Sequence, residues 1–135
     1  MQAVVHAMRS RHHEALAKAG VGLSPLEVRV LVYFARHPGA TQRELADHSG
    51  RDKGQVDRLV RGLHERGLLE ATDDPDDGRI TRVHLSPAAQ TLYQSVLRQR
   101  RRMANAVFEG IGNEERRRML ALLRRMHLNI ESPLP

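Results

Sequence analysis

The stretch from Asp52 to Leu85 changes its hydrophobic period once, and this change constrains the fold more than any other feature. Its first half carries apolar residues at helical spacing. They are Val56, Leu59, Val60 and Leu63. After Gly67 the chain turns to β-branched and aliphatic residues at 68–72 and 80–85, on either side of an acidic, turn-forming segment. The sequence therefore predicts a helix over 52–66, ended by Gly67, and then a β-hairpin.

Helix start signals recur before and after this unit. Ser24 offers an N-cap followed by Pro25 and, at the third helical position, Glu27. Thr41 begins a similar pattern, and Asp52 is expected to cap the next helix. Short connections between these signals indicate the order helix, short helix, turn, helix, hairpin, which is typical of a winged helix-turn-helix.

We expect one domain over 1–135, mainly α with a small β-hairpin wing. The winged helix-turn-helix occupies 23–86, and helices at 1–20 and 87–130 flank it. The flanking helices carry apolar stripes that the compact unit does not need. Because such stripes must be buried, and two-fold self-association is the simplest way, we predict dimerisation helices and a homodimer.

The chain is strongly basic, with a net charge of +6 and an isoelectric point near 10.9. A polyanion is the expected partner, with nucleic acid ahead of an anionic membrane surface or an acidic protein. There is no cysteine, no apolar run near the roughly 18–20 residues that cross a bilayer, and no secretion signal at the start of the sequence. We expect a cytoplasmic protein without cofactor, membrane association or enzymatic activity, since the acids do not pair beside a nucleophile.

The 52–66 helix has a contact face opposite its apolar stripe. Gly54 would let the backbone approach DNA, Arg58 or Arg61 could take a guanine or a phosphate, and Gln55 could read adenine. Asp57 would accept from cytosine or orient Arg61 across one helical turn.

The hairpin tip carries four aspartates, which by charge alone would oppose DNA binding. We expect them to cap the turn, with Asp77 bracing Arg79. Arg79 and Arg82 would supply outward positive charge, and Arg79 would enter a minor groove. A calcium loop is the rival interpretation, but Pro75 occupies a ligand position and His84 stands where the last acid belongs.

The chain resembles the MarR family of multiple-antibiotic-resistance-type regulators over about residues 23–90. The matching motifs are Leu23-Ser24-Pro25-Leu26-Glu27, Arg43-Glu44-Leu45-Ala46, Asp52-Lys53, Arg58-Leu59-Val60, Gly67-Leu68 and the wing segment Asp74-Pro75-Asp76-Asp77-Gly78-Arg79. The resemblance implies a homodimer that represses transcription and releases DNA when a small anionic or phenolic ligand binds. The sequence departs from the family at Gly54, Gln55 and Asp57, where Ser or Thr is common, and at Gly78, where a basic residue is common.

A set of residues is expected to contact double-stranded DNA. It comprises Thr41, Gln42, Arg51, Lys53, Gly54, Gln55, Asp57, Arg58, Arg61, Asp77, Arg79 and Arg82. The predicted function is sequence-specific regulation at a palindromic operator. A non-sequence-specific architectural DNA-binding protein shares the basic charge, and a protein-binding winged helix would lack the steep salt dependence.

The first helix carries histidines that could be structural or functional. His12 lies on its apolar stripe, which is more typical of a packed, hydrogen-bonded core residue than of a ligand contact. In the family, pockets lie between the dimerisation helices and the DNA-binding domain, so His12, His13, Arg29 and Tyr33 could share one. His6 and His13 alone do not make a zinc site.

Overall fold

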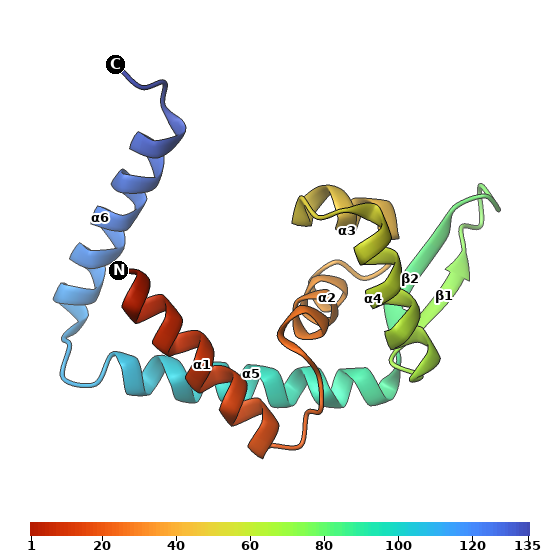
Figure 1. Ribbon diagram of the computed structural model, residues 1–135, viewed down its shortest axis with the longest axis horizontal. Coiled ribbons are helices and arrows are strands. Elements are labelled where there is room, and N and C mark those ends of the chain that lie inside the picture. Colours follow the sequence, from red (N-terminus) through yellow and green to blue (C-terminus); the bar gives the residue numbers. More distant parts are fainter. The chain divides into compact units, whose positions relative to one another are not determined.

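The computed structural model describes residues 1–135 as six helices and one two-stranded antiparallel sheet (Figure 1). The elements are α1 (Gln2–Lys18), α2 (Pro25–Arg36), α3 (Gln42–Ser49), α4 (Lys53–Glu65), β1 (Leu69–Asp73), β2 (Thr81–Leu85), α5 (Pro87–Val107) and α6 (Asn113–Glu131). The chain forms two compact units, residues 1–100 and 101–135. The predicted fold class, mainly α with a hairpin wing, is confirmed.

Most of the predicted helix starts are confirmed by hydrogen bonds. The Ser24 hydroxyl accepts from the Glu27 N–H at 3.2 Å, and the Glu27 carboxylate accepts from the Ser24 N–H at 2.9 Å. Thr41 caps α3 in the same way, although no returning bond from Glu44 accompanies it. Together these caps fix where α2 and α3 begin.

The predicted cap at Asp52 is wrong in one respect. Asp52 is the N-cap of α4, but its side chain makes no capping hydrogen bond. A capping carboxylate would accept a hydrogen bond from the Gln55 N–H. That N–H donates instead to the Asp52 backbone carbonyl at 3.1 Å. The Gln55 amide is therefore satisfied by the backbone, and Asp52 stays exposed.

The core of the first unit lies around α2. Phe34 and Leu31 of α2 are fully buried together with Val56 and Leu63 of α4 and Val96 of α5. The predicted apolar stripe of α4 is confirmed, because Val60 is also buried and Leu59 packs against the core. This packing fixes which side of α4 faces inward and so leaves the opposite side to solvent.

The hairpin pairs Leu69 with Leu85 at its base and Asp73 with Thr81 next to its tip. Its second strand is also bonded to the segment between α2 and α3. The Gly39 N–H donates to the Val83 carbonyl, and the Val83 N–H donates to the Ala40 carbonyl, both at 3.0 Å. The wing is thus attached to the helix-turn-helix by backbone as well as by packing.

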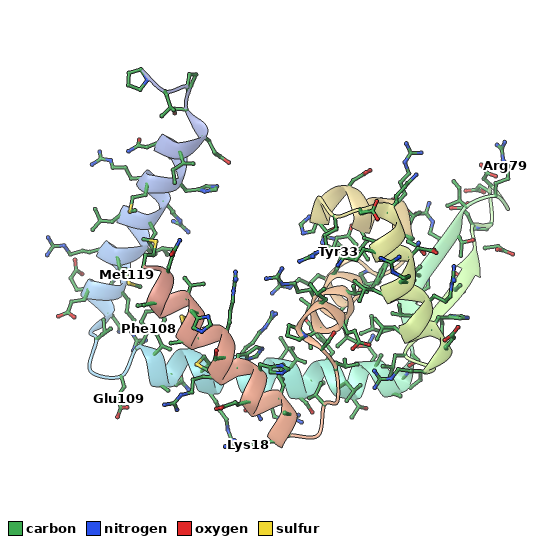
Figure 2. The ribbon with its side chains drawn as sticks, in the orientation of Figure 1. Lys18, Tyr33, Arg79, Phe108, Glu109 and Met119 are labelled. Carbon is green, nitrogen blue, oxygen red and sulfur yellow. The ribbon has the colours of Figure 1, made fainter.

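Within the unit formed by residues 101–135, Arg116 of α6 contacts the segment just after α5. Arg116 lies over the Phe108 ring, 5.1 Å from its centroid, and donates to the carbonyls of Phe108 and Ile111 at 3.0 Å (Figure 2 labels Phe108). The apolar side chains of α6 remain exposed in this single chain. They are Met119, Leu120, Leu122, Leu123, Met126, Leu128 and Ile130. No helix combines the length and apolar character needed to cross a membrane.

Candidate nucleic-acid interface

The solvent-facing side of α4 carries a basic surface. Lys53, Gly54, Arg58 and Arg61 are exposed, and Gln55 is partly exposed between them. Because α3 packs against α4 at the turn, this face is held as in other helix-turn-helix units, in which the second helix fits a major groove. The structure therefore brings together most of the α4 residues predicted from the sequence.

The side chain of Asp57 joins three of the predicted residues. One carboxylate oxygen accepts from the Gln42 amide at 2.8 Å, and the other accepts from the Arg61 guanidinium at 2.7 Å. Of the two roles predicted for Asp57, orientation of Arg61 is the one the geometry provides. Gln42 also lines an open cleft with Lys53, Gly54 and Asp57, and Arg43, which was not in the predicted set, lines it too.

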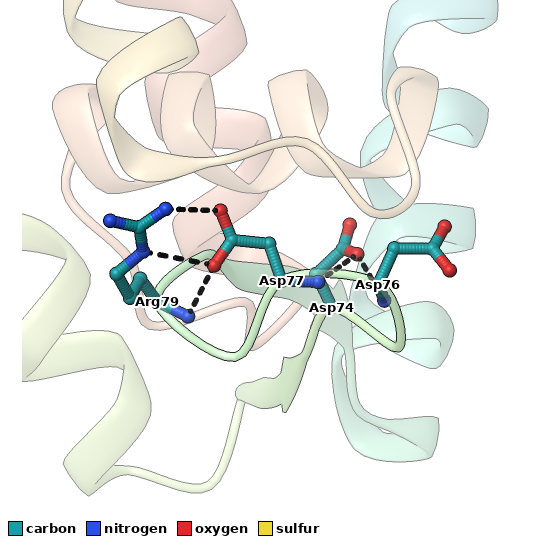
Figure 3. Close-up of polar contacts among 4 residues, drawn as sticks. All are labelled: Asp74, Asp76, Asp77 and Arg79. Atoms are coloured by element: carbon teal, nitrogen blue, oxygen red, sulfur yellow. Dashed lines mark hydrogen bonds and ion pairs between the residues drawn. The ribbon is translucent and has the colours of Figure 1, made fainter.

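The wing tip presents Arg79 to solvent, 92% exposed, at the end of the hairpin (Figures 2 and 3). The Asp77 carboxylate accepts from the Arg79 side chain at 3.1 and 3.3 Å and from its backbone N–H at 3.0 Å. The Arg79 guanidinium, and then its N–H, hold the pKa of the Asp77 carboxyl below its ordinary value. The predicted hydrogen bonding of Arg79 by Asp77 is therefore present in the structure.

Asp74 organises the rest of the acidic turn. Its carboxylate accepts from the backbone N–H groups of Asp76 at 2.8 Å and Asp77 at 3.1 Å. The Asp74 carboxylate also accepts from the Arg82 guanidinium. The bond from the Asp76 N–H, and then the bond from Arg82, lower the pKa of the Asp74 carboxyl. Two of the four aspartates, Asp74 and Asp77, therefore hold the turn with their carboxylates, as expected from their position.

Arg82 does not point outward as predicted. Its guanidinium donates to the Asp74 carboxylate at 2.9 Å and to the Gly39 carbonyl at 3.2 Å, and its side chain is 36% exposed. The outward expectation is wrong because a strand residue beside an acidic turn gains more from a charge-assisted bond than from solvent. Of the other predicted contact residues, Thr41 caps α3 and Arg51 lines a cavity beside α2.

A cavity of about 320 Å³ lies beside α2 and contains two of the four predicted ligand residues, Arg29 and Tyr33 (Figure 2 labels Tyr33). Arg36, Arg51 and Arg100 also line it, whereas no aspartate or glutamate does. None of the four arginines has a salt-bridge partner. Burial, and then the charge of Arg36, lowers the pKa of Arg100. The cavity therefore gathers four arginines that have no ion-pair partner.

One wall of the cavity is aromatic. Tyr33 packs against His37, with ring centroids 4.6 Å apart, and against His48 at 5.1 Å. Burial raises the pKa of Tyr33, and the charges of Glu44 and Asp47 raise it further. The phenol therefore stays protonated and able to donate a hydrogen bond. A flat, anionic molecule would suit this combination of an aromatic wall and free guanidinium groups.

His12 and His13 do not line this cavity. His12 is half-buried, and its Nε2 atom is buried without a hydrogen-bond partner, so the expected hydrogen-bonded core histidine is wrong at that atom. Burial, followed by the charges of Arg100 and His13, lowers the pKa of His12. His13 and His6 are exposed on α1. Sequence reasoning missed Arg36, His37, His48 and Arg100 as lining residues. Arg100 was missed because the run at 98–102 has the composition of a solvated face.

The fold and this basic surface define a winged helix-turn-helix protein of the class that regulates transcription by binding DNA. A MarR family model matches residues 21–80. The chain is 28% identical over 116 residues to the uncharacterised HTH-type transcriptional regulator YdgJ of Bacillus subtilis, covering 86% of this chain and 70% of YdgJ.

Solved structures of transcriptional regulators share the fold of this chain. The transcriptional regulator PA3341 superposes with a TM-score of 0.77 at 28% identity, over 96% of this chain and 94% of that one. The S. aureus MepR–DNA complex superposes with a TM-score of 0.77 at 21% identity, over 96% of this chain and 92% of that one. Over residues 21–80 the chain is similar to the MarR family, and the relatives and solved structures it matches are transcriptional regulators.

Proposed function

We propose that the chain is a homodimeric repressor that binds a palindromic operator, with α4 in the major groove and Arg79 in the adjacent minor groove. The observation that carries this proposal is the pairing of an exposed α4 face with an arginine braced at the wing tip. A guanidinium held in place loses less conformational freedom when it binds, and a narrow minor groove attracts it. Gln55, Arg58 and Arg61 are the proposed base-reading residues.

The exposed apolar surface outside the DNA-binding region supports dimerisation. On α1, Met1, Val4, Val5 and Met8 are exposed, and α6 exposes a longer apolar face. Large contiguous apolar surfaces on a single chain indicate an interface. We therefore assign the segments 1–20 and 87–130 to the dimer and 23–86 to DNA binding.

We assign release from DNA to the cavity beside α2, which fits a small anionic or phenolic effector. Arg29 and Arg100 would bind the acid group, and Tyr33 would donate a hydrogen bond to it or stack on its ring. His37 ends α2, two residues before Gly39, whose carbonyl bonds Arg82 of the wing. A ligand that displaces His37 thus acts close to the attachment of the wing.

Half-site spacing tests the dimeric readout. Two symmetric reading heads require half-sites about one helical turn, or 10–10.5 bp, apart. Inserting half a turn between them is expected to abolish tight binding, leaving the affinity of random duplex. Equal binding before and after the insertion would instead indicate a non-sequence-specific architectural protein.

Ligand-dependent melting tests the cavity. Benzoate and phenol are expected to raise the melting temperature and to weaken operator binding, because a ligand that binds only the folded state stabilises it. The neutral control benzamide should have a smaller effect than benzoate, and Arg100→Gln should reduce the difference, because Arg29 still faces the acid group. If benzoate and benzamide acted alike on the native protein, the anionic class would be wrong.

A further inference from the structure

Asp57 stands at the centre of the α4 contact face, yet both of its carboxylate oxygens are already engaged. Gln42, on α3, donates to Oδ1 at 2.8 Å, and Arg61, one turn further along α4, donates to Oδ2 at 2.7 Å. The side chains of Asp57 and Arg61 are 48% and 65% exposed. The carboxylate therefore lies where it influences DNA while its strongest acceptor positions face protein donors.

We propose that Asp57 is a positioning residue that sets base selectivity by holding Arg61 in one orientation, and that it does not itself contact a base. This inference rests on the proposed function, because it assigns a source of selectivity within the α4 readout. Asp57 acts on DNA only through Arg61.

The charge of the pair explains why such an arrangement favours selectivity. A free arginine gains affinity from any phosphate it neutralises, whatever the sequence. An arginine already paired with a carboxylate has much of that charge compensated, so its attraction to the DNA backbone is weaker. Its remaining N–H donors keep their fixed fork geometry and can still match the acceptors of a guanine. The pair therefore reduces sequence-independent binding more than it reduces readout.

The bond from Gln42 makes this restraint stronger than an isolated surface ion pair. A lone exposed pair across one helical turn stabilises little, because both side chains remain free to rotate. Here the Asp57 carboxylate is also attached to α3, which packs against α4. Arg58, on the same exposed face, has no ion-pair partner and provides an internal contrast. Of these two arginines of α4, Arg61 alone has its guanidinium held by a carboxylate.

The test is Asp57→Asn, which keeps the shape and an acceptor for Gln42 but removes the charge that holds Arg61. Affinity is measured by fluorescence anisotropy for a random-sequence duplex and for the duplex most enriched from a random pool by the native protein. The matched control is Asp52→Asn, which removes the same charge from the start of α4, where the carboxylate caps nothing. Thermal melting confirms that each variant is folded.

We expect Asp57→Asn to bind random duplex about fivefold more tightly, because the charge of Arg61 is no longer compensated, and to lose about fivefold or more in the ratio of enriched to random affinity. The gain on random duplex should shrink to about twofold or less when Arg61→Ala is also present, because the two residues act together. It should persist with Arg58→Ala. Asp52→Asn should give the same gain in all three backgrounds.

Two results overturn the proposal. One is an Asp57→Asn variant that loses enriched and random affinity alike, or changes neither. The other is a gain on random duplex that is equal with and without Arg61, as a pure charge effect would give. If the native protein itself shows no preference for any enriched duplex, the proposed function fails instead, and the Arg61 background comparison on random duplex still decides whether Asp57 acts through Arg61.

Discussion

The guanidinium of Arg82, on β2, donates a hydrogen bond of 3.2 Å to the carbonyl of Gly39, 43 residues earlier in the chain. The same guanidinium donates to Asp74, whose carboxylate also accepts two backbone N–H groups of the wing tip. One side chain thus connects the loop after α2, the second wing strand and the tip turn. This connection adds to the backbone bonds of Gly39, Ala40 and Val83 that also attach the wing.

Replacing Arg82 with alanine is therefore expected to loosen the wing without unfolding the protein. Affinity should fall roughly tenfold for all duplexes alike, since the contact that is lost positions the wing and reads no base. Hydrogen exchange should become faster at the Gly39 and Val83 amides, which join the wing to the loop. Unchanged exchange together with reduced binding would mean that Arg82 contacts DNA directly.

Arg79→Ala is expected to weaken DNA binding strongly while leaving the dimer intact. Because each of the two wings loses one cation that neutralises DNA charge from the minor groove, the slope of log affinity against log salt should fall by about 2. Asp77→Asn removes the brace and should cost less affinity than Arg79→Ala, whereas Asp76→Asn, whose carboxylate holds no arginine, is the matched control. Native-like affinity of Arg79→Ala at moderate salt would exclude the wing from the interface.

His12 is expected to make stability depend on pH. Its pKa is lowered in the folded state from the ordinary histidine value of 6.5, mainly by burial, so the unfolded chain takes up the proton first as the pH falls. The stability contributed by neutral His12 is present above about pH 6.5 and is lost as the pH falls through the lower folded pKa. Urea unfolding of His12→Gln should show a flatter pH dependence than the native protein. His6→Gln, on the exposed surface of α1, should retain the native slope.

Leu123 lies within the exposed apolar face of α6, 42% exposed in the single chain. Leu123→Glu places a charge where the proposed dimer buries apolar surface, and sedimentation equilibrium should show dissociation towards monomer. Leu134→Glu, in the exposed tail, is the matched control and should remain dimeric. A helical Leu123→Glu protein that stays dimeric would place the interface elsewhere.

The fold was largely predictable because its signals are local. Caps at Ser24 and Thr41 and the change of period after Gly67 each depend on neighbouring residues, and the structure confirms them. Asp52 differs because its backbone carbonyl, and not its carboxylate, accepts the hydrogen bond from the Gln55 N–H. That competition within one turn leaves no mark in the sequence.

The site was predictable only in part, because tertiary contacts decide where long side chains point. The Asp77–Arg79 brace joins neighbours and was foreseen, whereas the turn of Arg82 towards Gly39 joins distant segments. Arg100 lies in an arginine run, and only the folded structure shows that this member faces a cavity with Tyr33. The pairing of Gln42 with Asp57 likewise depends on how α3 packs against α4.

The central claim is that two copies of the α4 and wing surface read a palindrome, and selection of bound duplexes from a random pool tests it most directly. We predict one enriched palindrome, with half-sites about one helical turn apart, bound on the order of 10³-fold or more tightly than random duplex. A pool that binds with steep salt dependence but yields no consensus would contradict the account.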